Sequence, residues 1–458
     1  MKKVSKYQNT KILVLGLAKS GVAAAKLLFE LGAFVTVNDA KKLEENPAAQ
    51  ELLELGMTVI TGSHPTDLLD EGFSLIVKNP GIPYTNPILQ QAKTKSIPVI
   101  TEIELAYDVS EAPIIGITGT NGKTTTTTMI ANILNYHRTK GKALLAGNIG
   151  FPASDVATKA TTADVMVTEL SSFQLLGTID FKPTIAVITN LFEAHIDYHG
   201  TREDYVAAKW RLQKNMTADN FLILNYNQDE IRQLAKKTEA TVVPFCTNGL
   251  TVEGAYLLDK KLYFKEDYIM DVADLGVPGM HNVENALAAI AVAKLLGTPT
   301  DAIRVALCQF SGVKHRTEFI GVFDGKKVYN DSKATNMLAT EKALSGFNNQ
   351  ELVLIAGGLD RGNDFDDLLP YLRGLKAVVL TGETKHKLQK TCQEAGITEI
   401  ILVDTMQEAV SQAMRLASEN DNILLSPACA SWDQYKTFEE RGDCFVSEVQ
   451  EYVGRLTK

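Results

Sequence analysis

The chain has 458 residues, of which 45% are hydrophobic and 22% charged, and its formal net charge is -9. That length allows about three domains of roughly 150 residues, and the composition is that of an ordered globular protein. The acidic balance argues against a non-specific nucleic-acid binder, and no run approaches the ~18 apolar residues of a membrane span. Five scattered cysteines without a C-x-x-C pair predict neither a disulfide framework nor a zinc site, which suits a reducing cytoplasm.

Residues 1–102 are expected to form a Rossmann-like domain. Short β-branched runs such as "KILVLGL", "FVTVND" and "SLIVKNPG" alternate with helices expected over about 22–31 and 48–55. The turn "GLAKSG", from Gly16 to Gly21, is similar to a dinucleotide-binding turn with Ala18 at the middle glycine position, and Asp39 closes the second strand. Such a turn could bind a redox cofactor or another nucleotide diphosphate equally well. The third interpretation is an ordinary α/β turn that binds no ligand.

Residues 103–312 are expected to form a central ATPase-like domain with a mixed sheet. It opens with "IIGIT", and "GTNGKT" follows before a helix. Glycines that let backbone N–H groups approach closely, a lysine cation and a threonine hydroxyl for Mg²⁺ are the parts of a phosphate-binding loop. The loop is shorter than the common form, because Ile117 occupies the place of the first glycine. The alternative is an ordinary strand-to-helix turn.

Three further residues of this domain are candidate metal-site residues. Glu169 follows the apolar run "VMVT", where an acidic side chain could take Mg²⁺ beside the phosphate loop. His195 and Lys209 lie in "TNLFEAHIDYHGTREDYVAAKWRLQ" after another buried strand. Each also has a simpler interpretation: a strand-end carboxylate, a surface histidine and a solvated helical lysine.

Residues 313–458 are expected to form a third, Rossmann-like α/β domain. The segments "HRTE", "NDSKATN", "AGGLDRGNDFD" and "SPACASWDQYKTFEERG" all fall at its turns, mostly after predicted strands. In open α/β sheets that edge binds ligands, so these charged and hydroxyl residues indicate a binding site.

Taken together, these motifs resemble the Mur ligase family over essentially the whole chain. "GTNGKTT" marks the superfamily, "NPGIP" its early-acting members, and "DRGNDFD" with "SPACASWDQYKTFEERG" its D-glutamate-adding branch. Arg361 is one departure, since lysine also occurs there; arginine can pair a carboxylate bidentately. The resemblance implies that ATP phosphorylates the alanine carboxylate of UDP-N-acetylmuramoyl-L-alanine and that the amine of D-glutamate displaces phosphate, a step of bacterial peptidoglycan synthesis.

The resemblance also implies roles for individual residues. Catalysis is assigned to Lys123, Glu169, His195 and Lys209, and the metal site, with two Mg²⁺ ions expected, to Thr124, Glu169, His195 and Lys209. ATP is assigned to Gly119, Thr120, Asn121, Gly122, Lys123, Thr124, Thr125, Asn285, Arg316, Asp331 and Lys333. The UDP-sugar is assigned to Gly16, Ser20, Asn38, Asp39 and Asn148, and D-glutamate to Thr335, Arg361, Ser431 and Phe438.

Lys209 is expected to be carbamylated. An ammonium beside two Mg²⁺ ions would be repelled, so this lysine should have a lowered pKa and react with CO₂ to give an anionic metal ligand. A cytoplasmic monomer that binds neither nucleic acid nor membrane is expected.

Three rival functions stay open at this point. One is another ATP-dependent amino-acid ligase of the Mur or folylpolyglutamate type. The second is an NAD-dependent dehydrogenase built on "GLAKSG", which leaves "GTNGKTT" and the third domain unexplained. The third is a nucleotide switch, which would hydrolyse ATP slowly without needing both an acceptor and an amine.

Overall fold

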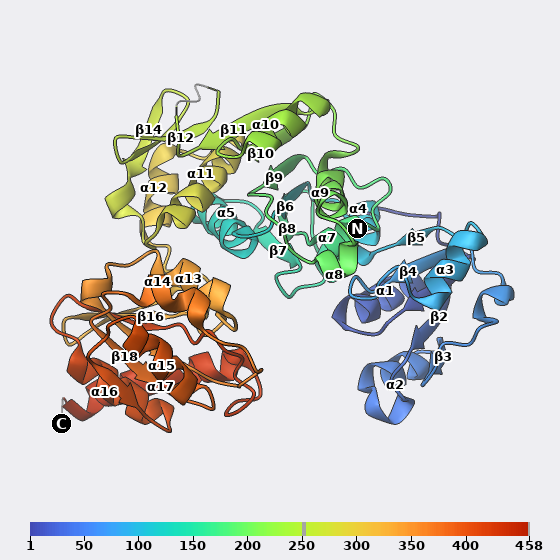
Figure 1. Ribbon diagram of the computed structural model, residues 1–458. Helices are drawn as coiled ribbons and strands as arrows, with labels where there is room; N and C mark the ends of the chain where they lie inside the picture. Colours follow the sequence, from blue (N-terminus) through green and yellow to red (C-terminus); the bar gives the residue numbers. More distant parts are fainter. Residues whose placement is uncertain (250–252, 457–458) are drawn as a thin grey trace. The chain divides into compact units, whose positions relative to one another are not determined.

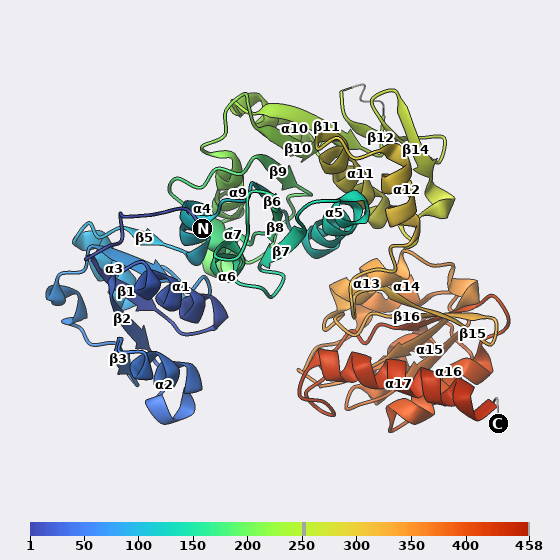
Figure 2. The ribbon, with the colours of Figure 1, turned by 180° about the vertical axis from the view of Figure 1, so that it is seen from behind.

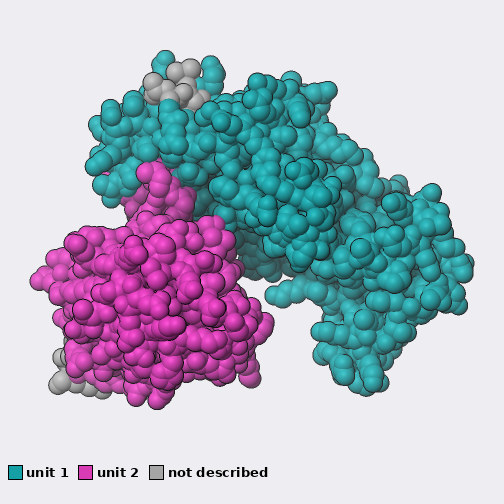
Figure 3. Space-filling view, viewed as in Figure 1, with its two compact units in different colours: residues 1–273, 284–307 teal, residues 274–283, 308–458 magenta. Residues whose placement is uncertain are grey.

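The computed structural model describes residues 1–249 and 253–456, and these residues build three separate β-sheets with helices packed on them (Figure 1). They divide into two compact units, residues 1–273 with 284–307 and residues 274–283 with 308–458 (Figure 3). The predicted α/β fold is confirmed, while the domain boundaries at 102/103 and 312/313 stay predictions. Residues 250–252 of the predicted central domain and 457–458 of the third lie outside the described residues. Among the described helices, none has the length and apolarity needed to cross a bilayer.

The first sheet is entirely parallel, with the strand order β3-β2-β1-β4-β5. Its strands are β1 (Lys11–Leu15), β2 (Phe34–Asp39), β3 (Thr58–Thr61), β4 (Leu75–Lys78) and β5 (Val99–Ile100), and its helices are α1 (Lys19–Glu30), α2 (Pro47–Glu54) and α3 (Pro87–Thr94). Side chains alternate across the pleat, so β1 supplies Val14 to the core beneath α1 and α2 and Leu15 to the core beneath α3. The strand order reverses between β1 and β4, where doubly wound sheets bind ligands.

The central sheet has nine strands in the order β14-β13-β12-β11-β10-β9-β6-β8-β7. It is mixed as expected, because β13 and β14 run antiparallel to their neighbours. The strands are β6 (Ile114–Thr118), β7 (Ala143–Gly147), β8 (Val165–Glu169), β9 (Ile185–Ile188), β10 (Phe221–Asn225), β11 (Thr241–Cys246), β12 (Ala255–Leu258), β13 (Lys261–Phe264) and β14 (Asp267–Asp271). Its helices are α4 (Glu102–Val109), α5 (Lys123–His137), α6 (Ala153–Ala157), α7 (Ser172–Leu175), α8 (Ile196–His199), α9 (Arg202–Trp210), α10 (Asp229–Leu234), α11 (Met280–Leu295) and α12 (Thr300–Cys308).

The order of the central strands places the predicted site. Strand β6 lies between β8 and β9, and the register pairs Ile117 with Glu169 on one side and Thr118 with Ile188 on the other. The parallel ends of these strands therefore bring Glu169 and the segment after β9 to the two sides of the loop that follows β6.

The third sheet has the order β15-β16-β20-β17-β18-β19, with only the edge strand β15 antiparallel. Its strands are β15 (Glu318–Phe323), β16 (Lys326–Asn330), β17 (Leu352–Ala356), β18 (Ala377–Leu380), β19 (Ile400–Leu402) and β20 (Asn422–Leu425), and its helices are α13 (Met337–Leu344), α14 (Leu369–Leu372), α15 (Lys385–Glu394), α16 (Met406–Leu416) and α17 (Phe438–Leu456). Helices α16 and α17 lie side by side over one face (Figure 2), and α13, α14 and α15 pack on the other.

Short 3₁₀ segments complete the connections. They are η1 (Leu43–Glu45), η2 (Leu68–Glu71), η3 (Arg211–Gln213), η4 (Ala235–Lys237), η5 (Val272–Asp274), η6 (Asn349–Glu351) and η7 (Asp366–Leu368).

Candidate active site

The loop between β6 and α5 has a backbone that only glycine fits at two positions. Gly119 has a φ of +147° and Gly122 a φ of +79°. A Cβ atom on Gly119 would lie 1.9 Å from Thr189 Oγ1, and one on Gly122 would lie 2.2 Å from Asn285 Oδ1. The loop therefore packs against the segment after β9 and against α11, and its backbone leads straight into the N-terminus of α5, which favours an anion.

Residues that follow β9 hold this loop in shape. The backbone N–H of Asn121 donates to Asn190 Oδ1 at 2.8 Å, and the Thr189 hydroxyl donates to the Asn121 carbonyl at 2.6 Å. The Thr120 hydroxyl oxygen accepts a hydrogen bond from the Tyr205 hydroxyl at 3.0 Å. These contacts fix the direction of the loop amides before any ligand arrives, which is the preorganisation that a phosphate site needs.

Two lysines converge on the carbonyl oxygen of Gly119. Lys123 Nζ donates to it at 3.0 Å, and Lys209 Nζ donates to it at 2.7 Å from α9. Lys209 is buried at 2% exposure. Burial, and next the charge of Lys123, lower the pKa of Lys209 well below its ordinary value, against a smaller opposing effect of Glu169. The interpretation of Lys209 as a solvated lysine is therefore wrong, and its pKa is lowered by burial and Lys123 rather than by the Mg²⁺ ions on which the expectation rested.

The remaining predicted ATP residues of the first unit lie around the same loop. Thr124 and Thr125 are in the first turn of α5, with Thr125 buried and Thr124 half-buried. Asn285 is buried on α11, and its Oδ1 accepts the Thr126 hydroxyl at 3.2 Å.

Glu169 ends β8 with a buried carboxylate at 2% exposure. Its Oε1 accepts the Asn148 side-chain amide at 2.7 Å. Its Oε2 is buried and accepts no hydrogen bond from any of the described residues. A buried carboxylate oxygen without a partner is costly unless a ligand completes it, so Glu169 has the chemistry of a metal ligand.

His195 stands on the other side of the loop in a left-handed conformation, with a φ of +56°, at the start of α8. The residue is exposed, and desolvation of its ring, followed by the charges of Lys209 and Lys123, lowers the pKa of its imidazole. The lowered pKa favours the neutral imidazole, which keeps one nitrogen lone pair for a metal ion or a proton.

These side chains fit a magnesium site only in combination with other ligands. Among residues 1–249 and 253–456, no three histidine, cysteine or acidic side chains form a cluster that could hold a metal ion. The orphaned oxygen of Glu169, the neutral imidazole of His195 and the hydroxyl of Thr124 are separate donors. Magnesium commonly takes one or two protein ligands together with phosphate oxygens and water, and this donor set suits that pattern.

The turn after β1 is built as a tight cradle. Gly16 has a φ of +89°, and a Cβ atom on Gly21 would lie 1.9 Å from the Gly16 carbonyl oxygen. Asp39 Oδ2 accepts the backbone N–H of Leu17 at 2.7 Å, and Ser20 Oγ accepts the Asn79 amide at 3.0 Å. The structure therefore brings Gly16, Ser20 and Asp39 together at one turn.

Asn38, also predicted to bind the UDP-sugar, is fully buried. Its side-chain amide donates to the carbonyls of Ile60 at 3.0 Å and Ser63 at 2.9 Å, and its Oδ1 lies 2.5 Å from His64 Nδ1. With both amide hydrogens bonded to protein, Asn38 shapes the segment after β3. Asn148 is exposed, and it is placed beside Glu169 in the central domain.

In the second unit, Asp331 is a buried carboxylate at the end of β16. Its Oδ1 accepts the backbone N–H of Thr317 at 3.0 Å, and its Oδ2 accepts the Ser426 hydroxyl at 2.8 Å. Burial raises the pKa of Asp331 to about 7 in spite of these hydrogen bonds. Arg316 lies close enough to oppose that shift, and its Nε is buried without a hydrogen-bond partner in the described part of the chain.

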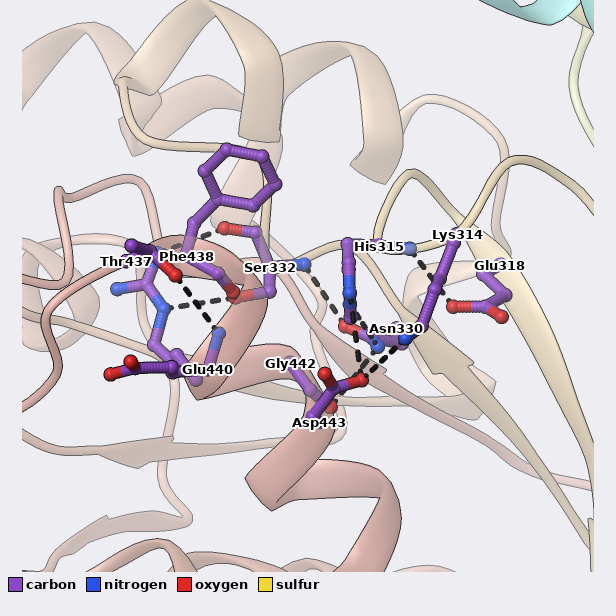
Figure 4. A network of polar contacts seen from close by, with 11 residues as sticks. Lys314, His315, Glu318, Asn330, Ser332, Thr437, Phe438, Glu440, Gly442 and Asp443 are labelled. Atoms are coloured by element: carbon purple, nitrogen blue, oxygen red, sulfur yellow. Dashed lines mark hydrogen bonds and ion pairs between the residues drawn. The ribbon is translucent and has the colours of Figure 1, made fainter. Parts of the chain in front are cut away.

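The neighbouring loop is tied to the start of α17, as Figure 4 shows. Ser332 Oγ donates to the Phe438 carbonyl at 2.7 Å, and the His315 ring lies 3.0 Å from the Asn330 amide. The ammonium of Lys333 lies 5.3 Å from the centroid of the Phe438 ring. Lys333 and Phe438, predicted from separate motifs, are thus in contact, while Asp331, next to Ser332, is held by Thr317 and Ser426.

A cavity of about 740 Å³ lies beside this network within the second unit. Its lining includes two residues predicted to bind D-glutamate, Thr335 and Arg361, together with residues 428–430. The Arg361 guanidinium stacks 4.9 Å from the centroid of the Trp432 ring. Ser431 adjoins the lining, and its buried Oγ meets no hydrogen-bond partner among the described residues. The cavity offers a cation and a hydroxyl to a small carboxylate ligand.

Sequence reasoning missed the residues that support the site. Thr189 and Asn190 were present in "TNLF", directly after a predicted strand, and their short polar side chains beside a glycine loop were the available signal. Arg441 is 3% exposed, and its Nη2 donates to the carbonyls of Ser332 at 2.9 Å and Cys429 at 3.0 Å. Nothing in "FEERG" distinguishes this buried arginine from a surface one.

The phosphate loop and the residues around it define a candidate nucleotide-phosphate site in an α/β protein built on three sheets. Three known sequence families match the chain: the MurD-like N-terminal domain of Mur ligases over residues 10–101, the Mur ligase middle domain over 117–293 and the Mur ligase glutamate ligase domain over 315–429. The chain belongs to the Mur ligase family.

Relatives match over nearly the full length. The UDP-N-acetylmuramoylalanine–D-glutamate ligase of Enterococcus faecalis is 63% identical over 451 residues, which are 98% of this chain and 99% of that protein. The protein of the same name from Lactococcus lactis subsp. lactis is 60% identical over 450 residues, with coverage of 98% and 99%.

Solved structures share the fold. The UDP-N-acetylmuramate–alanine ligase of Thermotoga maritima has a TM-score of 0.57 and 21% identity, covering 97% of this chain and 100% of that one. The MurF ligase of Thermotoga maritima in complex with ADP has a TM-score of 0.56 and 14% identity, with coverage of 98% for both chains. At these identities the likeness is one of fold.

Proposed function

We propose that this chain uses ATP to join D-glutamate to UDP-N-acetylmuramoyl-L-alanine in the synthesis of peptidoglycan precursors. The relatives at 58–63% identity that bear the name of this activity cover nearly the whole chain, which supports the choice of substrates. The observation that carries the chemistry is the convergence of Lys123 and Lys209 on the carbonyl of Gly119 in a preformed phosphate loop.

The reaction proceeds in two steps. A carboxylate is a poor electrophile at neutral pH, so a carboxylate oxygen of the alanine first attacks the γ-phosphorus of ATP, the bond from that phosphorus to ADP breaks, and an acyl phosphate forms. The neutral amine of D-glutamate then attacks the acyl carbon, the carbon–oxygen bond breaks, and phosphate leaves. The amine proton departs to a base or to water, and an amide remains.

The phosphate loop stabilises the phosphoryl oxygens on which charge accumulates. The backbone amides of Gly119 and Gly122 and the ammonium of Lys123 supply hydrogen-bond donors and a positive charge, with Thr120, Asn121 and Thr125 assigned to complete the cradle. Two Mg²⁺ ions are expected. Bound Mg²⁺ would neutralise phosphate charge, and Thr124, Glu169 and His195 would hold it. Asn285, Arg316, Asp331 and Lys333 are assigned to the rest of the nucleotide.

The other two substrates are assigned to the first and third sheets. The turn with Gly16 and Ser20, braced by Asp39 and Asn38, receives the UDP moiety, and Asn148 meets the sugar-nucleotide near its reacting end. Arg361 pairs a D-glutamate carboxylate in the cavity that it lines together with Thr335, and Ser431 and Phe438 are assigned to the same substrate.

Lys209 is carbamylated in the working enzyme. Its lowered pKa gives a neutral amine, and that amine adds to CO₂ with loss of one proton to give a carbamate. The carbamate replaces an amine whose charged form Lys123 repels with an anion that a metal ion attracts.

The chain acts as a cytoplasmic monomer on small molecules, without nucleic acid. All three substrates are small and phosphate- or carboxylate-bearing, and each finds a local site on a chain of net charge -9.

Mass spectrometry of the products tests this function. The chain is incubated with ATP, Mg²⁺, UDP-N-acetylmuramoyl-L-alanine and, in parallel, D-glutamate, L-glutamate, D-aspartate or L-lysine. We expect one amide product and ADP only with D-glutamate. Phosphate release without any acceptor would indicate a nucleotide switch, and a product with L-lysine alone would indicate a different ligase of the family.

A further inference from the structure

Lys78 is a buried lysine without an acidic partner. It ends β4 in the first sheet, in the segment "KNPGIP", and is 1% exposed. Within residues 1–249 and 253–456, no carboxylate lies within ion-pair distance of its Nζ, which donates to the Pro80 carbonyl and to the Tyr198 hydroxyl, both at 3.2 Å. The aromatic ring of Tyr84 lies 4.8 Å from the ammonium. Burying a cation this way is costly, so its contacts call for an explanation.

The partner of Lys78, Tyr198, belongs to the central domain. It lies on α8, the four-residue helix that starts directly after His195. Its hydroxyl oxygen lies 3.1 Å from the carbonyls of Pro80 and Ile82 and accepts from Lys78. One tyrosine hydroxyl therefore joins α8 to the loop that follows β4.

Tyr198 also touches the residues that surround the metal-site candidates. Its ring meets the Phe173 ring edge-on with centroids 4.4 Å apart, and Phe173 in turn meets the His195 ring at 5.1 Å. Phe173 is on α7, which begins three residues after Glu169. A chain of contacts thus runs from Lys78 through Tyr198 and Phe173 to His195.

The contact between Lys78 and Tyr198 lies at the edge of a cavity. This cavity of about 470 Å³ adjoins Tyr198, and its lining includes Tyr84, Asp204 and Arg211. Because α8 makes fewer dispersion contacts where the cavity lies, the hydrogen bonds of Tyr198 with Lys78, Pro80 and Ile82 matter more for its position.

Lys78 is next to the proposed sugar-nucleotide turn. The following residue, Asn79, donates its amide to Ser20 Oγ at 3.0 Å. We propose that Lys78 is a positioning residue, which holds Tyr198 on the loop after β4 and through Phe173 sets the orientation of His195, so that the first domain controls the geometry of the phosphate site. This role rests on the proposed function only for its effect on turnover.

The test compares Lys78→Met and Tyr198→Phe with Lys11→Met. Methionine keeps the length of the side chain but removes the donor, and phenylalanine keeps the ring against Phe173. Lys11 lies on the neighbouring strand β1 in an exposed ion pair with Glu71, so its variant is a control for loss of a lysine.

The first readout is the imidazole resonance of His195 in ligand-free protein, which has seven histidines to assign. We expect Lys78→Met and Tyr198→Phe to shift this resonance in the same direction, while that of exposed His137 stays in place and Lys11→Met changes neither. An unmoved His195 resonance in both variants would overturn the proposal, whether or not the chain is a ligase.

The second readout is turnover with saturating substrates. We expect each single variant to lower kcat about tenfold with little change in the KM for ATP, and the double variant to be no worse than the poorer single one, because both remove the same link. Fully additive losses would contradict a shared contact. If wild-type protein has no ligase activity but the resonance shifts, the proposed function fails and the positioning role stands.

Discussion

Lys209 and Lys123, 86 residues apart in the chain, donate to the same carbonyl oxygen of Gly119, at 2.7 and 3.0 Å. Burial, and next the repulsion between these two close ammonium groups, lowers the pKa of Lys209. The arrangement favours a neutral or carbamylated Lys209 beside a charged Lys123, and this asymmetry underlies the predictions for the two lysines.

Lys209→Ala should lose most activity, because the carbamate that we propose as a metal ligand could not form. Acetate or formate, small enough to enter the vacated space, should restore part of it. The measurement is ligase turnover over a range of added carboxylate, with chloride at equal ionic strength as the control. Unchanged turnover in Lys209→Ala would contradict the assignment.

Lys123→Ala should reduce phosphoryl transfer by about 100-fold or more, the usual cost of losing one preorganised charge. Binding of the UDP-sugar should remain, because the turn with Gly16 lies on a different sheet. Phosphate release and calorimetric binding of UDP-N-acetylmuramoyl-L-alanine measure the two effects. Near-normal phosphate release by this variant would rule out the role of Lys123.

Arg361→Ala should raise the KM for D-glutamate far more than the KM for ATP, since the guanidinium lines the cavity of the second unit. Arg361→Lys should retain part of the affinity, because it keeps the charge but loses the bidentate geometry. Steady-state kinetics with each substrate varied in turn provide the measurement. An equal change in both constants would mean that Arg361 does not select the amino acid.

Asp331 should make folding stability fall as pH rises. Its pKa is raised from 3.8 to about 7 in the folded chain, so the folded state binds the proton more tightly than the unfolded state. That contribution is fully present below about pH 4 and is lost as the pH rises through about 7. Asp331→Asn, which cannot ionise, should show a flatter dependence of Tm on pH between 5 and 8 than the wild type; parallel curves would exclude a raised pKa.

The sequence predicted the fold class and most of the elements, because parallel strands such as β9 and β17 are continuous apolar runs. It missed the edge strands β14 and β15, whose residues are partly exposed and lack that signal. Helix α1 begins at Lys19, three residues before its expected start, since its first turn belongs to the glycine turn itself.

The candidate site was less predictable than the fold. The spacing of glycine, lysine and threonine in "GTNGKT" predicted the phosphate loop directly. The strand order then brings Glu169 beside that loop. The burial of Lys209 and the contact of Lys78 with Tyr198 arise from tertiary packing, and neither "VAAKW" nor "IVKNPG" carries a local sign of it. The roles assigned to the site residues stay predictions that the variants above address.

Transfer of ¹⁸O tests the central claim most directly. UDP-N-acetylmuramoyl-L-alanine labelled with ¹⁸O in the alanine carboxylate is converted with ATP and D-glutamate, and the released phosphate is analysed by mass spectrometry. If the carboxylate attacks ATP to give an acyl phosphate, each phosphate carries one ¹⁸O atom from the substrate. Unlabelled phosphate formed alongside the amide product would contradict the account.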